Sequence, residues 1–198
     1  ACKAHREKPD WKILQDPHVE AAELLNRGEL VAWFQGRMEF GARALGNRSI
    51  LANPTEEGIA DIINRQVKFR EKWRPFSPSV LDSVAAEFSE EEFDDEYMCI
   101  GVTLSKNWQE KYPAIAYADG STRAQIVRAD TNPSLHKLLS HFHELSGQGL
   151  LINTALSRPG EALACNPEDA INMFMGTDLK YLILENILVT KREESETW

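Results

Sequence analysis

Apolar and polar positions alternate along this chain with two periods, and each period predicts a different kind of element. Apolar residues three and four positions apart predict amphipathic helices over Pro17 to Asn26 and Pro133 to Ser146, each with a proline in its first turn. Pro167 to Met175 also begins with proline and predicts a third helix. A fourth helix is predicted over Glu56 to Val67, with Thr55 as its N-cap.

Short apolar runs bounded by Gly, Pro or Asn predict strands. These runs are Leu30 to Gln35, Ser49 to Ala52, Tyr97 to Leu104, Leu150 to Asn153, Tyr181 to Leu184 and Ile187 to Thr190. A hairpin is predicted from Ala114 to Ala118 and Thr122 to Arg128 around an Asp119-Gly120 turn, after a loop over Asn107 to Pro113. Because helices and strands mix without strict alternation, we expect an α/β (α+β) fold with an open, twisted, mixed sheet and flanking helices.

Length and composition indicate one globular domain. The 198 residues, 42% hydrophobic and 27% charged, are enough for one core. We expect residues 17–191 to form this domain, residues 1–16 a polar lead-in or linker, and residues 192–198 a tail. The chain opens without Met, on a charged segment, so we expect it to be the C-terminal piece of a longer protein.

The sequence predicts a cytoplasmic protein without a membrane anchor. No run of about 18 apolar residues is present, and the first residues lack the apolar region of a signal peptide. The three cysteines are widely spaced and odd in number: Cys2, Cys99 and Cys165. This pattern argues against a disulfide framework and a zinc site, and favours a reducing compartment. His136, His141 and His143 are interpreted as surface residues of one helix, so no metal ligands are predicted.

Charge is distributed unevenly. The chain has a net charge of −9, yet the stretch Gly36 to Leu81 carries 8 basic and 5 acidic residues against 14 and 26 elsewhere. A basic island in an acidic protein is a local positive field, which predicts an anion site. The acidic segment Glu87 to Glu96 is interpreted as a solvated surface, with a partner-docking patch as the alternative.

The candidate anion clamp lies in this island. Lys68, Arg70 and Arg74 are close enough in sequence to contact one phosphate chain, where cations neutralise the charge that develops in phosphoryl or adenylyl transfer. The alternative is an exposed basic loop. Arg43 and Arg48 lie earlier in the island, in a glycine-containing loop that lacks the Gly-Lys-Ser/Thr ending of a P-loop. They are further candidates for binding the anion; the alternative is that they form ion pairs with acidic neighbours. Arg123 is a further candidate, or a solvent-facing strand residue.

Six motifs, in order, carry a resemblance to a known family. They are GRMEFGARALGNRSILANP from Gly36, KFREKWRPFSPSVL from Lys68, ADGSTRAQ from Ala118, Asn132-Pro133, LINT from Leu151 and PEDA from Pro167. Over Glu29 to Lys191 the chain resembles the C-terminal domain of the O-carbamoyltransferases of nodulation-factor and antibiotic biosynthesis. A match this long, with its motifs in order, is specific.

The resemblance implies a YrdC-like fold and a set of site residues. In that fold a Lys-x-Arg element and a Ser-x-Asn element bind ATP and a small carbonyl substrate, which assigns Lys68 and Arg70 as catalytic. The residues implied to contact ATP or carbamoyl phosphate are Arg43, Arg48, Lys68, Arg70, Arg74, Arg123, Asn153, Thr154 and Ser157.

The resemblance also implies a division of labour. A YrdC-like domain takes carbamoyl phosphate and ATP, with Mg²⁺, and makes carbamoyl adenylate through carbamate. A separate N-terminal domain of the actin/hexokinase-like class, which carries iron, then transfers the carbamoyl group to an acceptor hydroxyl. This chain is therefore expected to perform only the activation half-reaction.

One departure from the family pattern keeps other functions open. The family usually reads Asn-Thr-Ser-Phe-Asn, and this chain has Ala155 in place of the serine and Ser157 in place of the second asparagine. Losing a hydrogen bond to a charged group costs about 1.5–3 kcal/mol. The alternatives are a catalytically weakened nucleotide-binding or regulatory module and, since YrdC-like folds are associated with tRNA modification, an RNA-binding protein. The net charge of −9 argues against nucleic acid.

Overall fold

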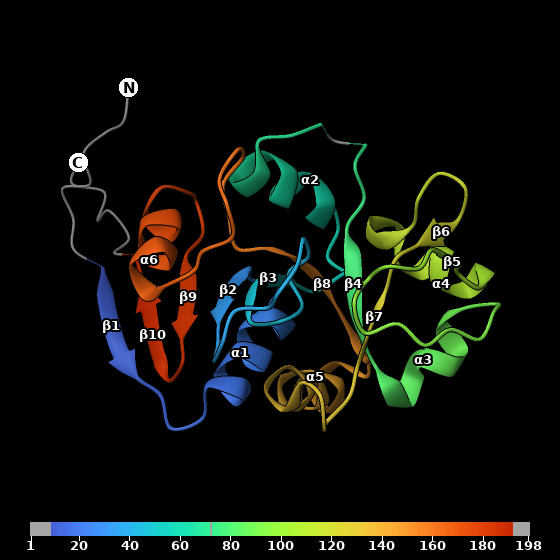
Figure 1. Ribbon diagram of the computed structural model, residues 1–198, viewed down its shortest axis with the longest axis horizontal. Helices are drawn as coiled ribbons and strands as arrows, with labels where there is room; N and C mark the ends of the chain where they lie inside the picture. Colours follow the sequence, from blue (N-terminus) through green and yellow to red (C-terminus); the bar gives the residue numbers. More distant parts are fainter. Residues whose placement is uncertain (1–8, 72, 192–198) are drawn as a thin grey trace.

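The computed structural model describes residues 9–71 and 73–191. Within them, eight strands form one sheet in the order β1-β10-β9-β2-β3-β8-β4-β7 (Figure 1). Their bounds are β1 Asp10–Ile13, β2 Val31–Phe34, β3 Arg48–Ala52, β4 Ser77–Leu81, β7 Gln125–Val127, β8 Leu150–Ala155, β9 Tyr181–Leu184 and β10 Ile187–Thr190. The pairs β2/β9 and β4/β7 are parallel and the others antiparallel. The predicted mixed open sheet is confirmed.

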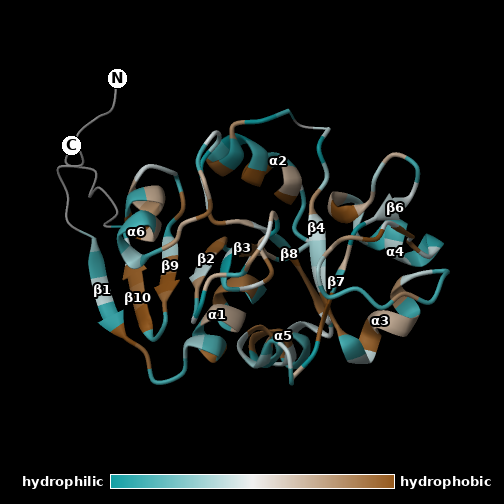
Figure 2. Cartoon of the chain, in the orientation of Figure 1, coloured by the Kyte–Doolittle hydropathy of each residue, from teal (hydrophilic) through white to brown (hydrophobic). Residues whose placement is uncertain are grey.

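Helices cover both faces of the sheet because side chains alternate along its strands. In Figure 1, α1 (Pro17–Asn26) and α5 (Pro133–Ser146) lie below the central strands, and α2 (Ile59–Ile63) lies above them. Val31 and Trp33 pack on the α1/α5 side, whereas Ala32 and Phe34 pack in the core that includes α2 and α6 (Pro167–Met175). Figure 2 colours β9 and β10 largely brown, as expected for strands covered on both faces.

The helices predicted from periodicity at Pro17, Pro133 and Pro167 are confirmed with the same bounds. Asn132 caps α5, and Asn166 forms a capping box with Asp169 in α6. Among the described residues, no helix is long and apolar enough to cross a bilayer.

The helix predicted over Glu56 to Val67 was wrong at both ends. It begins only at Ile59, after Gly58 in a left-handed conformation, and continues as a π-helix over Asn64–Lys68. Thr55 does not cap it, because its hydroxyl donates to Asn53 Oδ1 at 2.8 Å. Gly58 delays the helix because its positive φ is incompatible with helical geometry. The π turn then sets the position of the segment that follows.

The region between β4 and β7 differs most from expectation. No strand spans Tyr97 to Leu104: Val102–Thr103 forms the short strand β5, and Leu104 forms a single bridge with Ser89. Residues 97–100 instead fold around Asp95, whose carboxylate accepts hydrogen bonds from the backbone amides of Tyr97, Cys99 and Ile100. Asp95 is therefore a buried structural residue within a segment that was interpreted as a solvated surface.

The predicted hairpin and the loop before it were also wrong. The first expected strand, Ala114 to Ala118, does not form a strand. The second is divided between β6 (Ser121–Thr122), which pairs with β5, and β7, which joins β4 in the main sheet. The expected loop is a helix, α4 (Lys106–Lys111), followed by a 3₁₀ turn at Pro113–Ile115. Three further elements were not predicted: α3 (Asp82–Phe88), β4, which contains Pro78, and β1, an edge strand within the expected lead-in.

Candidate functional site

A cavity of about 830 Å³ lies between the end of β8 and the segment that carries Lys68, Arg70 and Arg74, here called the clamp segment. Its walls come from five parts of the chain: residues 42–44, residues 68–71 with 73–77, Met98, residues 117–123 and residues 153–161. It brings together eight of the nine predicted site residues: Arg43, Lys68, Arg70, Arg74, Arg123, Asn153, Thr154 and Ser157. The cavity therefore concentrates positive charge in an otherwise acidic chain.

Lys68 is the most deeply placed cation of the site. It ends the π-helix, is buried, and donates from Nζ to the backbone carbonyl oxygens of Ala155 and Ser157, the latter at 3.0 Å. Burial, and then the neighbouring Arg70, lowers the pKa of the Lys68 ammonium to about 8. Neutral carbonyls compensate its charge only in part, so an anion in the cavity would stabilise the protonated form.

Arg70 is oriented by two neighbours that leave most of its guanidinium unused. Its Nε donates to Asn64 Oδ1 at 2.6 Å, and its guanidinium carbon lies 4.5 Å from the centre of the buried Phe76 ring. Burial, followed by the nearby Arg74, lowers the pKa of Arg70. A guanidinium held by one edge and short of negative charge suits a phosphate or carboxylate.

Asn64 organises this segment and was missed by the sequence analysis. It is 1% exposed; its backbone carbonyl accepts from the Arg70 amide at 3.2 Å, and its Nδ2 donates to the carbonyl of Arg74 at 3.3 Å. The sequence did carry one signal for Asn64: it lies next to the apolar positions of a predicted helix, and a polar side chain buried there requires a hydrogen-bond partner. Asn64 therefore positions both arginines without lining the cavity.

The remaining arginines line the cavity at different depths. Arg123 is half-buried and donates from Nε to the hydroxyl of Tyr117 at 3.1 Å, a contact that sequence reasoning did not find. Arg43 and Arg74 are exposed. Arg158 also lines the cavity, but it is engaged by Glu161 through bonds of 2.9 and 2.5 Å.

The structure places Arg48 outside the cavity. This residue of β3 is buried, and its guanidinium lies 3.4 Å from the centre of the Phe34 ring. Its two terminal nitrogens donate to backbone carbonyl oxygens of Gln35, Gly36, Asn47 and Cys165 at 2.9–3.4 Å. Arg48 therefore anchors the glycine-containing loop through backbone carbonyls. It neither lines the cavity, as expected for an anion-binding residue, nor depends on an acidic neighbour.

A carboxylate secures the other side of the same loop. Oε1 of the buried Glu39 accepts from the backbone amides of Leu45, Asn47 and Arg48 at 2.6–3.2 Å. The loop also extends toward the sheet, because the Leu45 carbonyl accepts from Gln125 and Asn132. These contacts hold Arg43 at the cavity while satisfying the polar backbone of the loop.

Asn153 connects the cavity to the sheet through side chains of β4 and β7. Its Nδ2 donates to Ser79 Oγ at 2.9 Å and to Gln125 Oε1 at 3.3 Å, and Ser79 donates to Gln125 at 2.7 Å. This network is buried and stiffens the floor of the site. Asn153 Oδ1 is buried without a partner among the described residues.

The departure at Ala155 affects the site less than the sequence suggests. Lys68 binds the backbone carbonyls of Ala155 and Ser157, and these acceptors do not depend on the side chains. Thr154 and Ser157 still bring hydroxyl groups to the cavity wall. The change therefore removes one hydroxyl group and leaves the anchoring of Lys68 intact.

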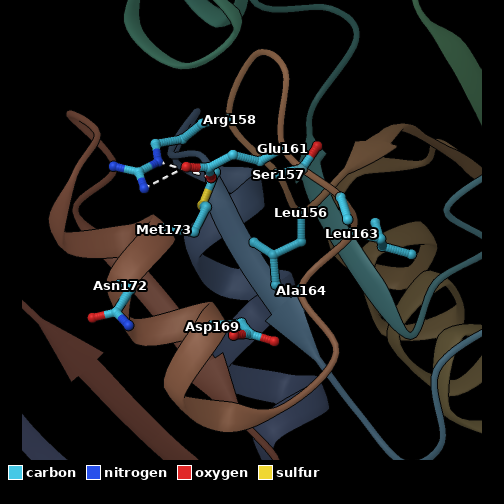
Figure 3. Close-up of a pocket in the computed structure, with 10 residues that line it drawn as sticks. Leu156, Ser157, Arg158, Glu161, Leu163, Ala164, Asp169, Asn172 and Met173 are labelled. Atoms are coloured by element: carbon cyan, nitrogen blue, oxygen red, sulfur yellow. Dashed lines mark hydrogen bonds and ion pairs between the residues drawn. The ribbon is translucent and has the colours of Figure 1, made fainter.

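A second, smaller cavity of about 320 Å³ adjoins the first and shares Ser157, Arg158 and Glu161 with it. In Figure 3 the Arg158–Glu161 ion pair closes one side of this cavity, and Asp169 and Asn172 project from α6 on the other. Among residues 9–71 and 73–191, no group of three or more His, Cys, Asp or Glu side chains is arranged to hold a metal ion.

Comparison with known proteins identifies relatives along nearly the whole chain. The family described as Carbamoyltransferase C-terminus matches residues 22–191. Nodulation protein NolNO of Sinorhizobium fredii is 38% identical over 189 residues, 92% of this chain and 28% of that protein. The 3'-hydroxymethylcephem-O-carbamoyltransferase of Streptomyces clavuligerus is 35% identical over 170 residues, 84% of this chain and 32% of that protein. The chain spans about a third of the length of the curated relatives it matches.

Solved structures agree on the fold. Full-length HypF, in a phosphate- and nucleotide-bound form, is 14% identical with a TM-score of 0.61 over 88% of this chain and 26% of that chain. Sua5 of P. abyssi, complexed with L-threonine, is 16% identical with a TM-score of 0.60 over 88% of this chain and 47% of that chain. The predicted YrdC-like fold is thereby confirmed.

Proposed function

Since this chain belongs to the carbamoyltransferase family, as its C-terminal domain, we propose that it activates the carbamoyl group by forming carbamoyl adenylate from carbamoyl phosphate and ATP. The observation that carries this proposal is the convergence of Lys68, Arg70, Arg74 and Arg123 on one cavity. Both substrates are phosphate anions, and both need positive charge where their phosphates lie.

The reaction sets two tasks for these residues. Water first converts carbamoyl phosphate to carbamate and phosphate; a carbamate oxygen then attacks the α-phosphorus of ATP and pyrophosphate leaves. The buried Lys68 and the half-buried Arg70 are suited to the phosphorus centre, because preorganised charge stabilises the transition state without having to reorganise. Arg74 and Arg123 would hold the departing pyrophosphate and fix the alignment.

Mg²⁺ would enter bound to the phosphates of ATP and share their charge. Of the two carboxylates that line the cavity, Glu161 is paired with Arg158, which leaves the exposed Glu71 as the residue able to approach such a metal. Transfer to an acceptor hydroxyl would fall to the N-terminal domain implied by the family resemblance, together with its iron.

Turnover of the purified chain tests the proposal. Pyrophosphate release would be followed with ATP, Mg²⁺ and carbamoyl phosphate, and carbamoyl adenylate would be identified by mass spectrometry. We expect release that requires carbamoyl phosphate and is lost in Lys68→Ala, whereas Lys180→Ala, at an exposed lysine that does not line the cavity, retains it. Failure to bind ATP and to form product, even after a relative's N-terminal portion is supplied, would contradict the proposal.

A second candidate is a nucleotide-binding module with weakened or no turnover, and Ala155 is the observation that favours it. Loss of one hydroxyl group at the cavity wall reduces the hydrogen bonds available to the nucleotide. ATP binding without adenylate formation, unchanged by the added N-terminal portion, would identify this module.

A further inference from the structure

Three aromatic residues of the clamp segment have different environments. Phe76 is 2% exposed and lies beneath the Arg70 guanidinium, so its role is structural. Phe69 and Trp73 line the same cavity but are 62% and 78% exposed. Large apolar side chains left open to water beside a set of cations have an energetic cost, and such placement is typical of a binding surface.

The backbone holds Phe69 in this exposed position. Phe69 has a φ of 44°, in the left-handed region that a bulky residue rarely adopts. Phe69 follows the last residue of the π-helix, and its amide donates to the carbonyl oxygen of Asn64, the first residue of that helix. The next amide, that of Arg70, donates to the same oxygen. The left-handed turn directs adjacent side chains to different places: Lys68 points inward to the end of β8, while Phe69 stays at the cavity surface.

We propose that Phe69 and Trp73 form a stacking platform for the nucleobase of ATP, a role that rests on the proposed function of the same cavity. The two parts of the cavity match the two parts of a nucleotide, because the arginines and Lys68 suit the phosphates and the aromatic rings suit the planar base. A cavity of about 830 Å³ has room for both.

The platform has a defined selectivity. Both side chains are aromatic and exposed, and stacking on an aromatic face does not read the hydrogen-bonding edge of a base. The platform therefore favours nucleotides over inorganic polyphosphate but discriminates weakly between ATP and GTP. Selection for adenine would require other groups.

The experiment compares ATP with inorganic tripolyphosphate, which has the phosphates without the base. Affinities of the folded chain for both would be measured by calorimetry, for the wild type, Trp73→Ala, Phe69→Leu and a control, Trp11→Ala. Trp11 is 67% exposed on the edge strand β1 and does not line the cavity, which makes it a matched exposed tryptophan. Phe69→Leu keeps apolar bulk and removes the π face.

We expect Trp73→Ala and Phe69→Leu each to weaken ATP roughly tenfold and to leave tripolyphosphate unchanged, with no effect of Trp11→Ala on either ligand. GTP should lose affinity in parallel with ATP. Equal weakening of ATP and tripolyphosphate would overturn the platform, as would unchanged ATP affinity in both variants.

The outcomes separate this inference from the function beneath it. Wild-type turnover with unchanged ATP affinity in the variants removes the platform and leaves the proposed reaction. Base-dependent binding without carbamoyl adenylate keeps the platform and removes the reaction. A wild type that binds tripolyphosphate as tightly as ATP refutes the platform directly.

Discussion

Arg48 and Arg70 make the same type of contact in two regions of the molecule and differ in what remains free. Each guanidinium lies over a phenylalanine ring, and burial lowers the pKa of each. The terminal nitrogens of Arg48 donate to four backbone carbonyls. Arg70 donates from Nε alone, and its terminal nitrogens have no hydrogen-bond partner among the described residues. A buried arginine is thus structural or available for a ligand according to its unused donors, and burial alone does not distinguish the two.

Removing Arg70 should give the largest functional effect. Arg70→Ala is expected to lower adenylate formation by roughly 10²–10³-fold, because a preorganised donor to the transition state is lost. The free energy of unfolding should fall by only about 1 kcal/mol, because one buried acceptor, Asn64 Oδ1, loses its donor. Steady-state pyrophosphate release and urea unfolding measure both quantities. Normal turnover with reduced stability would place Arg70 in the same class as Arg48.

Removing Arg48 should give the opposite result. Arg48→Met keeps a long apolar side chain over Phe34 but leaves the loop carbonyls without their donor, which should lower the free energy of unfolding by about 2–4 kcal/mol. Urea denaturation measures this change. ATP affinity, determined where the variant is fully folded, should fall by less than that of Arg70→Ala. A stable variant that loses ATP binding would contradict the anchoring role.

Lys68 lies between these two cases, because it donates to backbone carbonyls and also lines the cavity. Its pKa, lowered to about 8, predicts that ATP affinity falls roughly tenfold between about pH 7.5 and pH 9 as the free lysine loses its proton. Calorimetry across this range should show the fall in the wild type and a flat profile in Lys68→Met. An equally steep profile in the variant would assign the titration to another group.

The same pKa has the opposite consequence for stability. Because the folded chain disfavours the lysine proton, it binds fewer protons than the unfolded chain between about pH 8 and about pH 10.4. The contribution of Lys68 to the free energy of unfolding should therefore rise with pH in this window, while ATP affinity falls.

Restoring the family's serine should give the smallest effect. Ala155→Ser returns a hydroxyl to the cavity wall without disturbing the carbonyl that accepts from Lys68, and should tighten ATP about fivefold, the value of one hydrogen bond of about 1 kcal/mol. Ala162→Ser, outside this cavity, is the control. Weaker ATP binding in Ala155→Ser would show that the present wall is already complementary to its ligand.

The sequence by itself determined the elements whose patterns are long or strongly marked. Helices α1, α5 and α6 follow from their apolar spacing and starting prolines, and β9 and β10 from uninterrupted apolar runs. The family motifs, in order, implied the YrdC-like fold, and the excess of basic residues over Gly36 to Leu81 located the clamp.

Only the tertiary structure decided which partners these elements have. Val102–Thr103 pairs with Ser121–Thr122 across the segment that holds α4, and β7 pairs with β4. These partners are distant in sequence, so a local pattern of apolar residues does not identify them. The same reason separates Arg43 from Arg48: they are close in sequence, but only the fold shows that Arg43 reaches the cavity while backbone carbonyls surround Arg48. Asn64 went unnoticed because its role consists of contacts that exist only once the π turn has formed.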